Sequence, residues 1–214
     1  MQRRLFLRIA GGGTVAAAST LALAGCSSAL PPQAIAAWQG PGNEPDVRRW
    51  VLAHAILAPH SHNLQSWLVD LSEPDTITLF IDRGRLLPET DPFSRQMLMS
   101  QGTFLELLDQ AAREKGLRAD VELFPQGVFG PTAVDARPTA RVQLVQDAGV
   151  ARDPLFQQVF KRRTNREAYL PAEPSAAAMQ AIAGSTPLPG MRSGFVRATM
   201  VRNATNQITS AAKK

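Results

Sequence analysis

The spacing of apolar residues after residue 45 predicts a helix with one buried face. This helix covers residues 46–58, where Asp46 can cap the first turn and Pro59 ends the helical run. Its apolar side chains recur at helical spacing: Val47, Trp50, Val51 and His54. Leu52 and Ile56 extend the apolar surface around the side, so we expect the helix to be largely buried.

A strand hairpin and a longer helix are predicted next. The strands cover residues 67–71 and 76–82, because apolar and polar residues alternate in the second of them. The helix opens with Asp91 as its cap and Pro92 at its first position, and Gly116 ends it. Its main apolar stripe consists of Met97, Phe104, Leu108 and Ala111. The other predicted elements are strands over residues 119–124 and 139–146, a short helix over 153–161 and an Ala-rich helix after Pro171.

Composition and charge favour an ordinary globular protein without a nucleic-acid partner. The chain has 214 residues, of which 44% are hydrophobic and 19% are charged. Its net charge is +5, but Arg3, Arg4 and Arg8 precede the first apolar run, and without them the excess falls to about +2. No acidic residue follows Glu173, so residues 173–214 are expected to form a basic, Ala-rich tail that is either solvated or in contact with anionic lipid.

The first 43 residues have the pattern of an export signal followed by a tether. Arg3 and Arg4 precede an uncharged run and resemble a twin-arginine signal, and the run ends at Cys26 in a sequence that resembles the lipobox of bacterial lipoproteins. We therefore predict a signal peptide over residues 1–25, lipidation of Cys26 and a flexible tether over residues 26–43. The protein would then be anchored to membrane on the periplasmic side of the cell envelope. The alternatives are a chance cysteine site and an uncleaved anchor helix.

Three histidines, His54, His60 and His62, lie within nine residues of one another. The pair His60 and His62 has a spacing found in metal sites, since both side chains point the same way in an extended segment. No Asp, Glu or Cys nearby completes a tetrahedral pattern. The cluster is thus open to three interpretations: structural hydrogen bonding, cofactor contact and metal binding.

The segment from Ala58 to Trp67 resembles a motif of the FMN-dependent nitroreductase family, Ala-Pro-Ser-x-x-Asn-x-Gln-Pro-Trp. Asn63, Gln65 and Trp67 match this motif, whereas His60 stands where the family has Ser and Ser66 where it has Pro. The resemblance implies that Asn63 and Gln65 contact the flavin ring or its ribityl chain. An amide carries both a donor and an acceptor, as the edge of the ring requires. The alternative is a polar loop that joins a helix to a strand.

A second segment, Lys161 to Arg166, resembles the family's Arg-x-Ser-x-Arg phosphate site, with Thr164 in place of Ser. In an extended chain Arg162, Thr164 and Arg166 project to one side, so two guanidinium groups flank a hydroxyl. The alternative is a solvated basic run. Asp82-Arg83-x-Arg85 and Asp91-Pro92-x-x-Arg95 resemble landmarks of an exported, double-length branch in which two related halves share one chain.

The resemblance covers roughly residues 46–170 and implies an α+β fold, with a mixed, mainly antiparallel sheet flanked by helices. It assigns residues 44–172 to a nitroreductase-like half domain. In the double-length branch a second half follows, and the tail of this chain does not read like it. We therefore expect a fold that is incomplete at the C-terminus.

The implied function is that of an exported flavoprotein that reduces nitroaromatic or quinone-like acceptors through FMN. The expected partners are the flavin, a small-molecule electron acceptor and, through the lipid, a membrane, and a homodimer is possible. No side chain is expected to be an obligatory catalyst, because the flavin supplies the chemistry. Two alternatives stay open: a non-catalytic flavin-binding or sequestering lipoprotein, and a periplasmic metal-binding lipoprotein that uses His60 and His62.

Overall fold

The computed structural model describes residues 31–165, 167–168 and 174–184. The chain divides into two compact units, Met1–Arg163 and Thr164–Lys214. The first unit contains every strand of the described residues. It also contains the segment with Asn63 and Gln65, the two amides predicted to contact the flavin. The described part of the second unit contains one helix, the Ala-rich α5 (Ala176–Gly184), as the sequence predicts.

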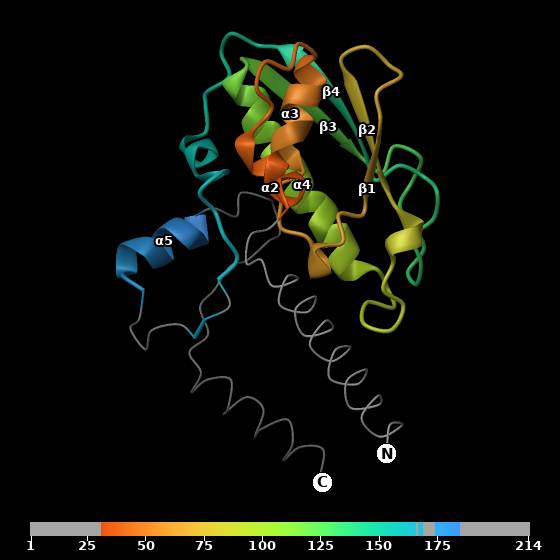
Figure 1. Ribbon diagram of the computed structural model, residues 1–214. Coiled ribbons are helices and arrows are strands. Elements are labelled where there is room, and N and C mark those ends of the chain that lie inside the picture. The colour runs from red at the N-terminus through yellow and green to blue at the C-terminus, as the bar shows by residue number, and fades with distance from the viewer. Residues whose placement is uncertain (1–30, 166, 169–173, 185–214) are drawn as a thin grey trace, which may run out of the picture. The chain divides into compact units, whose positions relative to one another are not determined.

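The sheet of the first unit has four antiparallel strands in the order β1-β2-β4-β3 (Figure 1). The strands are β1 (Trp67–Asp70), β2 (Thr76–Ile81), β3 (Leu117–Leu123) and β4 (Ala140–Gln146). All four overlap their predicted ranges, although β3 begins at Leu117, two residues earlier than expected. In β2 the residues at every second position, Ile77, Leu79 and Ile81, are buried and form the inner face of the sheet.

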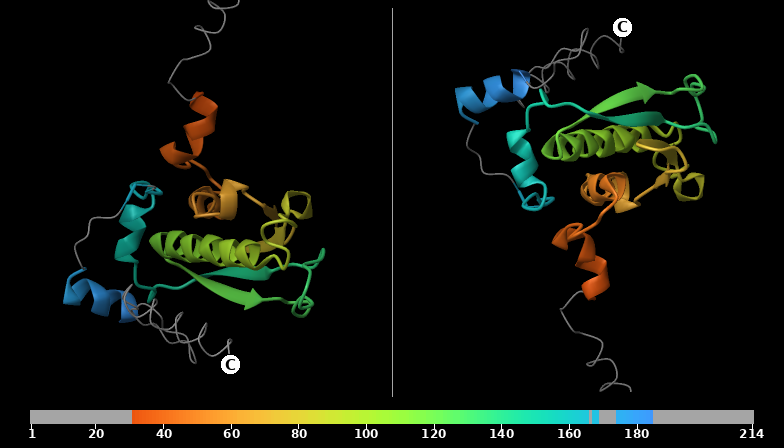
Figure 2. Two further views of the ribbon diagram at one scale, coloured as in Figure 1. Left: turned by 90° about the horizontal axis from the view of Figure 1, so that it is seen from below. Right: turned by 90° about the horizontal axis from the view of Figure 1, so that it is seen from above.

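Two helices cover this inner face. The long helix α4 (Arg95–Glu114) lies between the sheet and α3 (Val47–Ala55), as both views of Figure 2 show. The predicted stripe of α4 is fully buried: Met97, Phe104, Leu108 and Ala111 each have 0% exposure. Of these, Phe104, Leu108 and Ala111 pack in one cluster with Ile77, Leu79 and Val142 from the sheet and Val51 from α3. Helices on one face of an antiparallel sheet make an α+β fold, which confirms the predicted class.

The first turn of α4 differs from the prediction. The helix begins at Arg95, three residues later than expected, and Ser94 before it has a left-handed φ of 53°. The intervening residues form a turn in which the Ser94 N–H donates to the Asp91 carbonyl at 2.9 Å. Asp91 still caps the helix from this distance, because its carboxylate accepts from the N–H groups of Arg95 at 2.9 Å and Met97 at 3.1 Å.

Replacing Asp91 by alanine is expected to destabilise the protein by about 1–2 kcal/mol, since two N–H groups of α4 lose their acceptors. Asp91→Asn keeps one acceptor oxygen and should lie between the alanine variant and the wild type. Urea denaturation measures both effects. Glu89→Ala, at an exposed position two residues away, serves as the control. Equal stability of Asp91→Ala and wild type would show that the cap contributes nothing.

Short helical elements complete the first unit: α2 (Pro32–Ile35), η1 (Ala36–Gln39), η2 (Ser61–Asn63), η3 (Arg83–Arg85) and η4 (Pro154–Gln158). Two of them lie in residues 31–43, where a flexible tether is predicted, so this part of the segment is not coil throughout. Gly40, at φ 79°, contacts η4's neighbour Phe160 so closely that a Cβ there would lie 3.2 Å from the ring. The helix predicted over residues 153–161 is a 3-10 helix and ends at Gln158.

Candidate functional site

The segment that joins α3 to β1, residues 60–66, is termed the amide loop here. Three of its residues have left-handed backbone conformations: His62 at φ 52°, Asn63 at φ 53° and Gln65 at φ 52°. Residues other than glycine rarely adopt this backbone conformation. Backbone strain of this kind persists only where the surrounding structure holds the residue in place. Strain gathers at functional sites, and here it falls on both amides that the sequence singles out.

One side of the amide loop is fastened to α4. The Ser61 N–H donates to Ser100 Oγ at 3.1 Å, and the Ser61 hydroxyl donates to Gln96 Oε1 at 3.0 Å. The Pro59 carbonyl, just before the loop, accepts from Thr103 Oγ1 at 2.6 Å. These three α4 residues were not predicted as part of the site. Their partners lie about forty residues earlier, and polar residues at the rim of a helix carry no signal of their own in the sequence.

The other side of the loop is fastened to the end of β2. The Asp82 N–H donates to the Ser66 carbonyl at 2.7 Å. Arg85 Nη1 donates to the Leu64 carbonyl at 2.7 Å, and Arg85 Nε forms an ion pair of 3.0 Å with the Asp82 carboxylate. The landmark Asp82-Arg83-x-Arg85 therefore has a structural task in this chain: it supports the loop that carries the amides.

The two amides lie side by side. Gln65 Nε2 donates to Asn63 Oδ1 at 3.0 Å, Asn63 is exposed and Gln65 is partly exposed. Within the described part of the chain, the remaining polar atoms of both amides have no other hydrogen-bond partner. They therefore present donors and acceptors together at one accessible place, which suits a planar ligand with alternating polar groups at its edge.

His60 closes the amide loop at its base. Its Nδ1 lies 2.7 Å from the Ser61 carbonyl, and its Nε2 accepts from the Ser66 N–H at 3.1 Å. The ring also makes an edge contact with Trp67, at 4.7 Å between centroids. Burial lowers the pKa of His60, and the nearby positive charge of Arg85 lowers it further, against a raising effect of the Ser61 carbonyl. His60 is therefore a structural histidine.

This geometry gives no support to the metal-binding interpretation. Both ring nitrogens of His60 are engaged within the protein, whereas a metal ligand needs one of them free. His62, its predicted partner, is exposed. Among the residues that the structure describes, no group of three or more His, Cys, Asp or Glu side chains could hold a metal ion.

His54, which is buried, and His60, which is half-buried, make the stability sensitive to acid. Burial also lowers the pKa of His54, whose Nδ1 lies 2.9 Å from the Trp50 carbonyl. Because both pKa values are lowered in the folded protein, the unfolded chain binds protons at a higher pH than the folded protein does. The free energy of unfolding should then be constant well above pH ~6.5, the ordinary histidine value, and fall as the pH drops through that value. Urea titrations between about pH 7.5 and about pH 5.5 measure this loss. His60→Gln should reduce it and His62→Gln should not; an unchanged loss in His60→Gln would contradict the assignment.

Arg162 is the predicted phosphate residue that the structure brings near the amide loop. Its Nη2 donates to the Leu57 carbonyl at 2.6 Å, two residues before Pro59. Its Nε is buried without a hydrogen-bond partner, and in the described ranges no carboxylate pairs with its charge. A guanidinium with an unused N–H and no counter-charge suits an anion. Trp38 supports it from one side, 6.0 Å from the guanidinium carbon.

The other predicted site residues are not placed with Arg162. Thr164 is exposed and begins the second unit. Arg166 and the predicted lipidation site Cys26 lie outside the described residues. Arg163 stacks on Trp38 at 4.2 Å and donates to the carbonyls of Phe160 and Arg162, so it is engaged with its own segment. None of the helices in the described ranges is long and apolar enough to cross a membrane.

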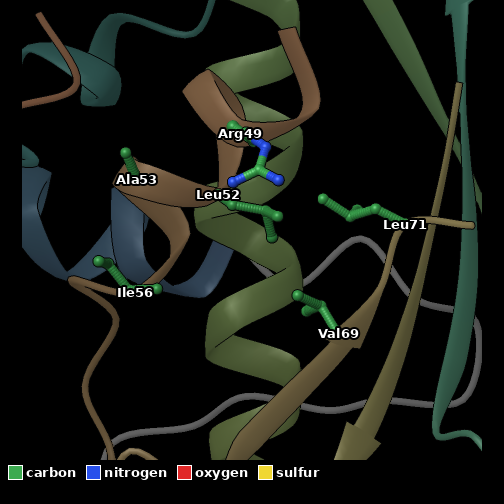
Figure 3. Close-up of a pocket in the computed structure, with 6 residues that line it drawn as sticks. All are labelled: Arg49, Leu52, Ala53, Ile56, Val69 and Leu71. Carbon is green, nitrogen blue, oxygen red and sulfur yellow. The ribbon is translucent and has the colours of Figure 1, made fainter. Parts of the chain in front are cut away.

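A groove between α3 and β1 has a volume of about 540 Å³ (Figure 3). Its lining residues are Arg49, Leu52, Ala53, Ile56, Val69 and Leu71. Leu52 and Ile56, expected in a largely buried helix, are thus only half-buried. Apart from Arg49 the lining carries no group that could hold or move a proton. The groove is an apolar surface, and the polar chemistry of the first unit lies in the amide loop.

No protein-family model matches the chain. It is 32% identical over 120 residues to a Serratia protein named as a probable NAD(P)H nitroreductase, PigM; the match covers 56% of this chain and 33% of that protein. It is 36% identical over 80 residues to the Mycobacterium tuberculosis protein acg, also provisionally named an NAD(P)H nitroreductase, with 37% of this chain and 24% of that protein covered. A third relative, Rv3131 of the same species, carries the same provisional name and is 36% identical over 123 residues, with 56% and 33% covered.

The matched region is about a quarter to a third of the length of these curated relatives. Similarity at this level supports a nitroreductase family for the chain, in agreement with the motif resemblance.

Proposed function

We propose, with the nitroreductase relatives as the premise, that this chain is a nitroreductase-like flavoprotein that reduces a nitroaromatic or quinone-like acceptor through FMN. The observation that carries the proposal is the pair of accessible amides, Asn63 and Gln65, held on a strained loop that α4 and the end of β2 fasten from both sides. A preorganised amide pair lowers the cost of binding a rigid polar ring.

The residues present fit the group. Asn63 and Gln65 offer donors and acceptors toward the ring or the ribityl chain, and Arg162 offers an N–H without a partner and a charge without a carboxylate toward the phosphate. We assign Thr164 and Arg166 to the phosphate as well, on the sequence pattern alone. When bound, FMN would supply the hydride chemistry, and the side chains would bind and orient it. We therefore name no catalytic residue.

We extend the proposal to the cell envelope on the sequence pattern. Residues 1–25 would direct export by the twin-arginine route, and Cys26 would carry the lipid that anchors the protein on the periplasmic side. A homodimer is part of the proposal too. Leu68 and Val69, on the edge strand β1, are 53% and 40% exposed, and apolar residues on an open strand edge favour self-association.

The visible absorption spectrum of the purified protein, with and without added FMN, tests the proposal. Bound flavin should shift the spectrum, and Asn63→Ala or Gln65→Ala should weaken binding roughly tenfold or more, the cost of hydrogen bonds to a ligand. Gln143→Ala, an exposed amide on β4, is the matched control. A protein that binds no FMN, or binds it equally well without both amides, would overturn the proposal.

A second measurement separates an enzyme from a flavin-binding or sequestering protein. Oxidation of a reduced nicotinamide in the presence of a nitroaromatic or quinone acceptor should depend on bound FMN if the chain is an enzyme. Flavin binding without turnover would favour the non-catalytic lipoprotein over the reductase.

A further inference from the structure

The two ends of the amide loop are joined through one imidazole ring. His60 Nε2 lies 3.1 Å from the Ser66 nitrogen, which donates to it, and 2.7 Å from Ser66 Oγ. Ser66 is fully buried and its hydroxyl also lies 3.4 Å from Met97 Sδ in the core. The backbone of Ser66 is in turn tied to the Asp82 N–H. We call the His60–Ser66 contact the clasp, since every left-handed residue of the loop lies between these two positions.

The clasp requires a neutral ring with its proton on Nδ1. The Ser61 carbonyl can only accept, so Nδ1 donates to it, and the Ser66 N–H can only donate, so Nε2 must keep its lone pair. A second proton on Nε2 would bring two N–H donors face to face at 3.1 Å. The Ser66 backbone cannot turn away, because its carbonyl is bonded to Asp82. The charged ring therefore loses the backbone bond of the clasp and keeps only the contact of Nε2 with Ser66 Oγ, which can accept while its hydroxyl donates to Met97 Sδ.

We infer that His60 is the positioning residue of the amide loop: its neutral ring holds Asn63 and Gln65 in their strained conformation, and the loop loosens when protonation of the ring breaks the bond from the Ser66 N–H. The inference rests on the proposed function for the identity of the ligand. The role of His60 in the loop itself follows from the contacts of the clasp alone.

The groups around the ring favour the neutral form near neutral pH. From the end of β2 and η3, the one charged group that acts on the ring is Arg85, whose own charge is balanced by Asp82. From α4, the neighbours of the loop are the neutral side chains of Gln96 and Ser100. From β1, the neighbour is the uncharged ring of Trp67, in a T-shaped contact. Burial and, to a smaller extent, the charge of Arg85 lower the pKa of His60 against the raising effect of the Ser61 carbonyl, so the backbone bond of the clasp is lost only on acidification.

Nuclear magnetic resonance of the full chain tests the clasp without any ligand. The ¹⁵N signals of the His60 ring should report the Nδ1–H form at neutral pH. On acidification the backbone amide signals of Asn63 and Gln65 should move with the same midpoint as the ring. His62, exposed and outside the clasp, supplies the internal control. Ring protonation that leaves the amide signals of the loop unmoved would overturn the inference.

Flavin binding gives a second readout. In wild type, FMN affinity should fall roughly tenfold or more between about pH 7.5 and about pH 5, as the loop loses its positioning. His60→Gln supplies an acceptor that does not titrate; it should keep the affinity at neutral pH within about threefold and remove the acid step. The FMN phosphate also gains a proton in this pH range, and this affects wild type and His60→Gln alike. The loss of affinity due to His60 is therefore the difference between the pH profiles of the two proteins. His62→Gln should keep the step.

The outcomes separate the two proposals. If no flavin binds at any pH, the proposed function fails, and the ring and amide signals still decide whether His60 positions the loop. If flavin binds and His60→Gln shows the same pH profile as wild type, the positioning role fails and the proposed function stands. His60→Ala is not needed for either decision, which keeps the test independent of a variant that fails to fold.

Discussion

Replacing Phe104 by alanine is expected to lower the free energy of unfolding by roughly 3–5 kcal/mol, the usual cost of deleting a fully buried aromatic ring. Phe104 lies in the middle of α4 with 0% exposure and packs against both the sheet and α3. Its ring also contacts that of Trp67, at 5.0 Å between centroids. Urea denaturation of wild type and variant measures the loss, and a domain of this size can be expected to lose a large part of its stability.

Met99→Ala is the matched control for this prediction. Met99 lies on the same helix, one turn and a half before Phe104, but is 71% exposed. Its removal should change stability by no more than about 0.5 kcal/mol. If both variants lost the same small amount, α4 would not be the centre of the core, and the buried stripe of this helix would have to be reconsidered.

The core of the first unit could be predicted because it depends on local periodicity. In α4 the stripe that begins at Met97 repeats at helical spacing, and in β2 the alternation that begins at Ile77 repeats at strand spacing. Each pattern tells which face of an element is apolar, and apolar faces must meet. The start of α4 was missed because the Asp91-Pro92 pair is a strong helix signal by itself, while the turn up to Ser94 delays the helix.

The candidate site could be predicted only in part. The resemblance directed attention to Asn63 and Gln65, and the structure places them together. Their left-handed conformations left no mark in the sequence, since neither position is glycine. His60 was open to three roles, and its hydrogen bonds favour the structural one over metal binding.

Long-range polar contacts were beyond prediction for a physical reason. Arg162 and the Leu57 carbonyl are 105 residues apart, and a backbone carbonyl has no side chain that could signal its partner. The same is true of Ser100, which holds the amide loop across 39 residues. Such contacts depend on where a helix ends in space, and this is set by packing rather than by local sequence.

A comparison of FMN with riboflavin isolates the part played by Arg162. Riboflavin has the same ring and ribityl chain but lacks the phosphate. Arg162→Ala should weaken FMN binding roughly 10–100-fold, the loss of one or two charge-assisted hydrogen bonds, and should change riboflavin binding little. In the structure Arg162 has an unpartnered buried Nε, and no carboxylate balances it among the residues described.

Arg163→Ala is the matched control, because it removes the same charge from the neighbouring position. Arg163 is bonded to carbonyls of its own segment and stacked on Trp38, so FMN affinity should fall no more than about threefold. Fluorescence titration of both flavins against wild type and the two variants decides the matter. Equal weakening of FMN and riboflavin by Arg162→Ala would mean that Arg162 acts only through Leu57, as a structural support of the segment that leads into the amide loop. Equal weakening of FMN by both variants would mean that the basic segment attracts the phosphate through its overall charge and contains no specific phosphate site.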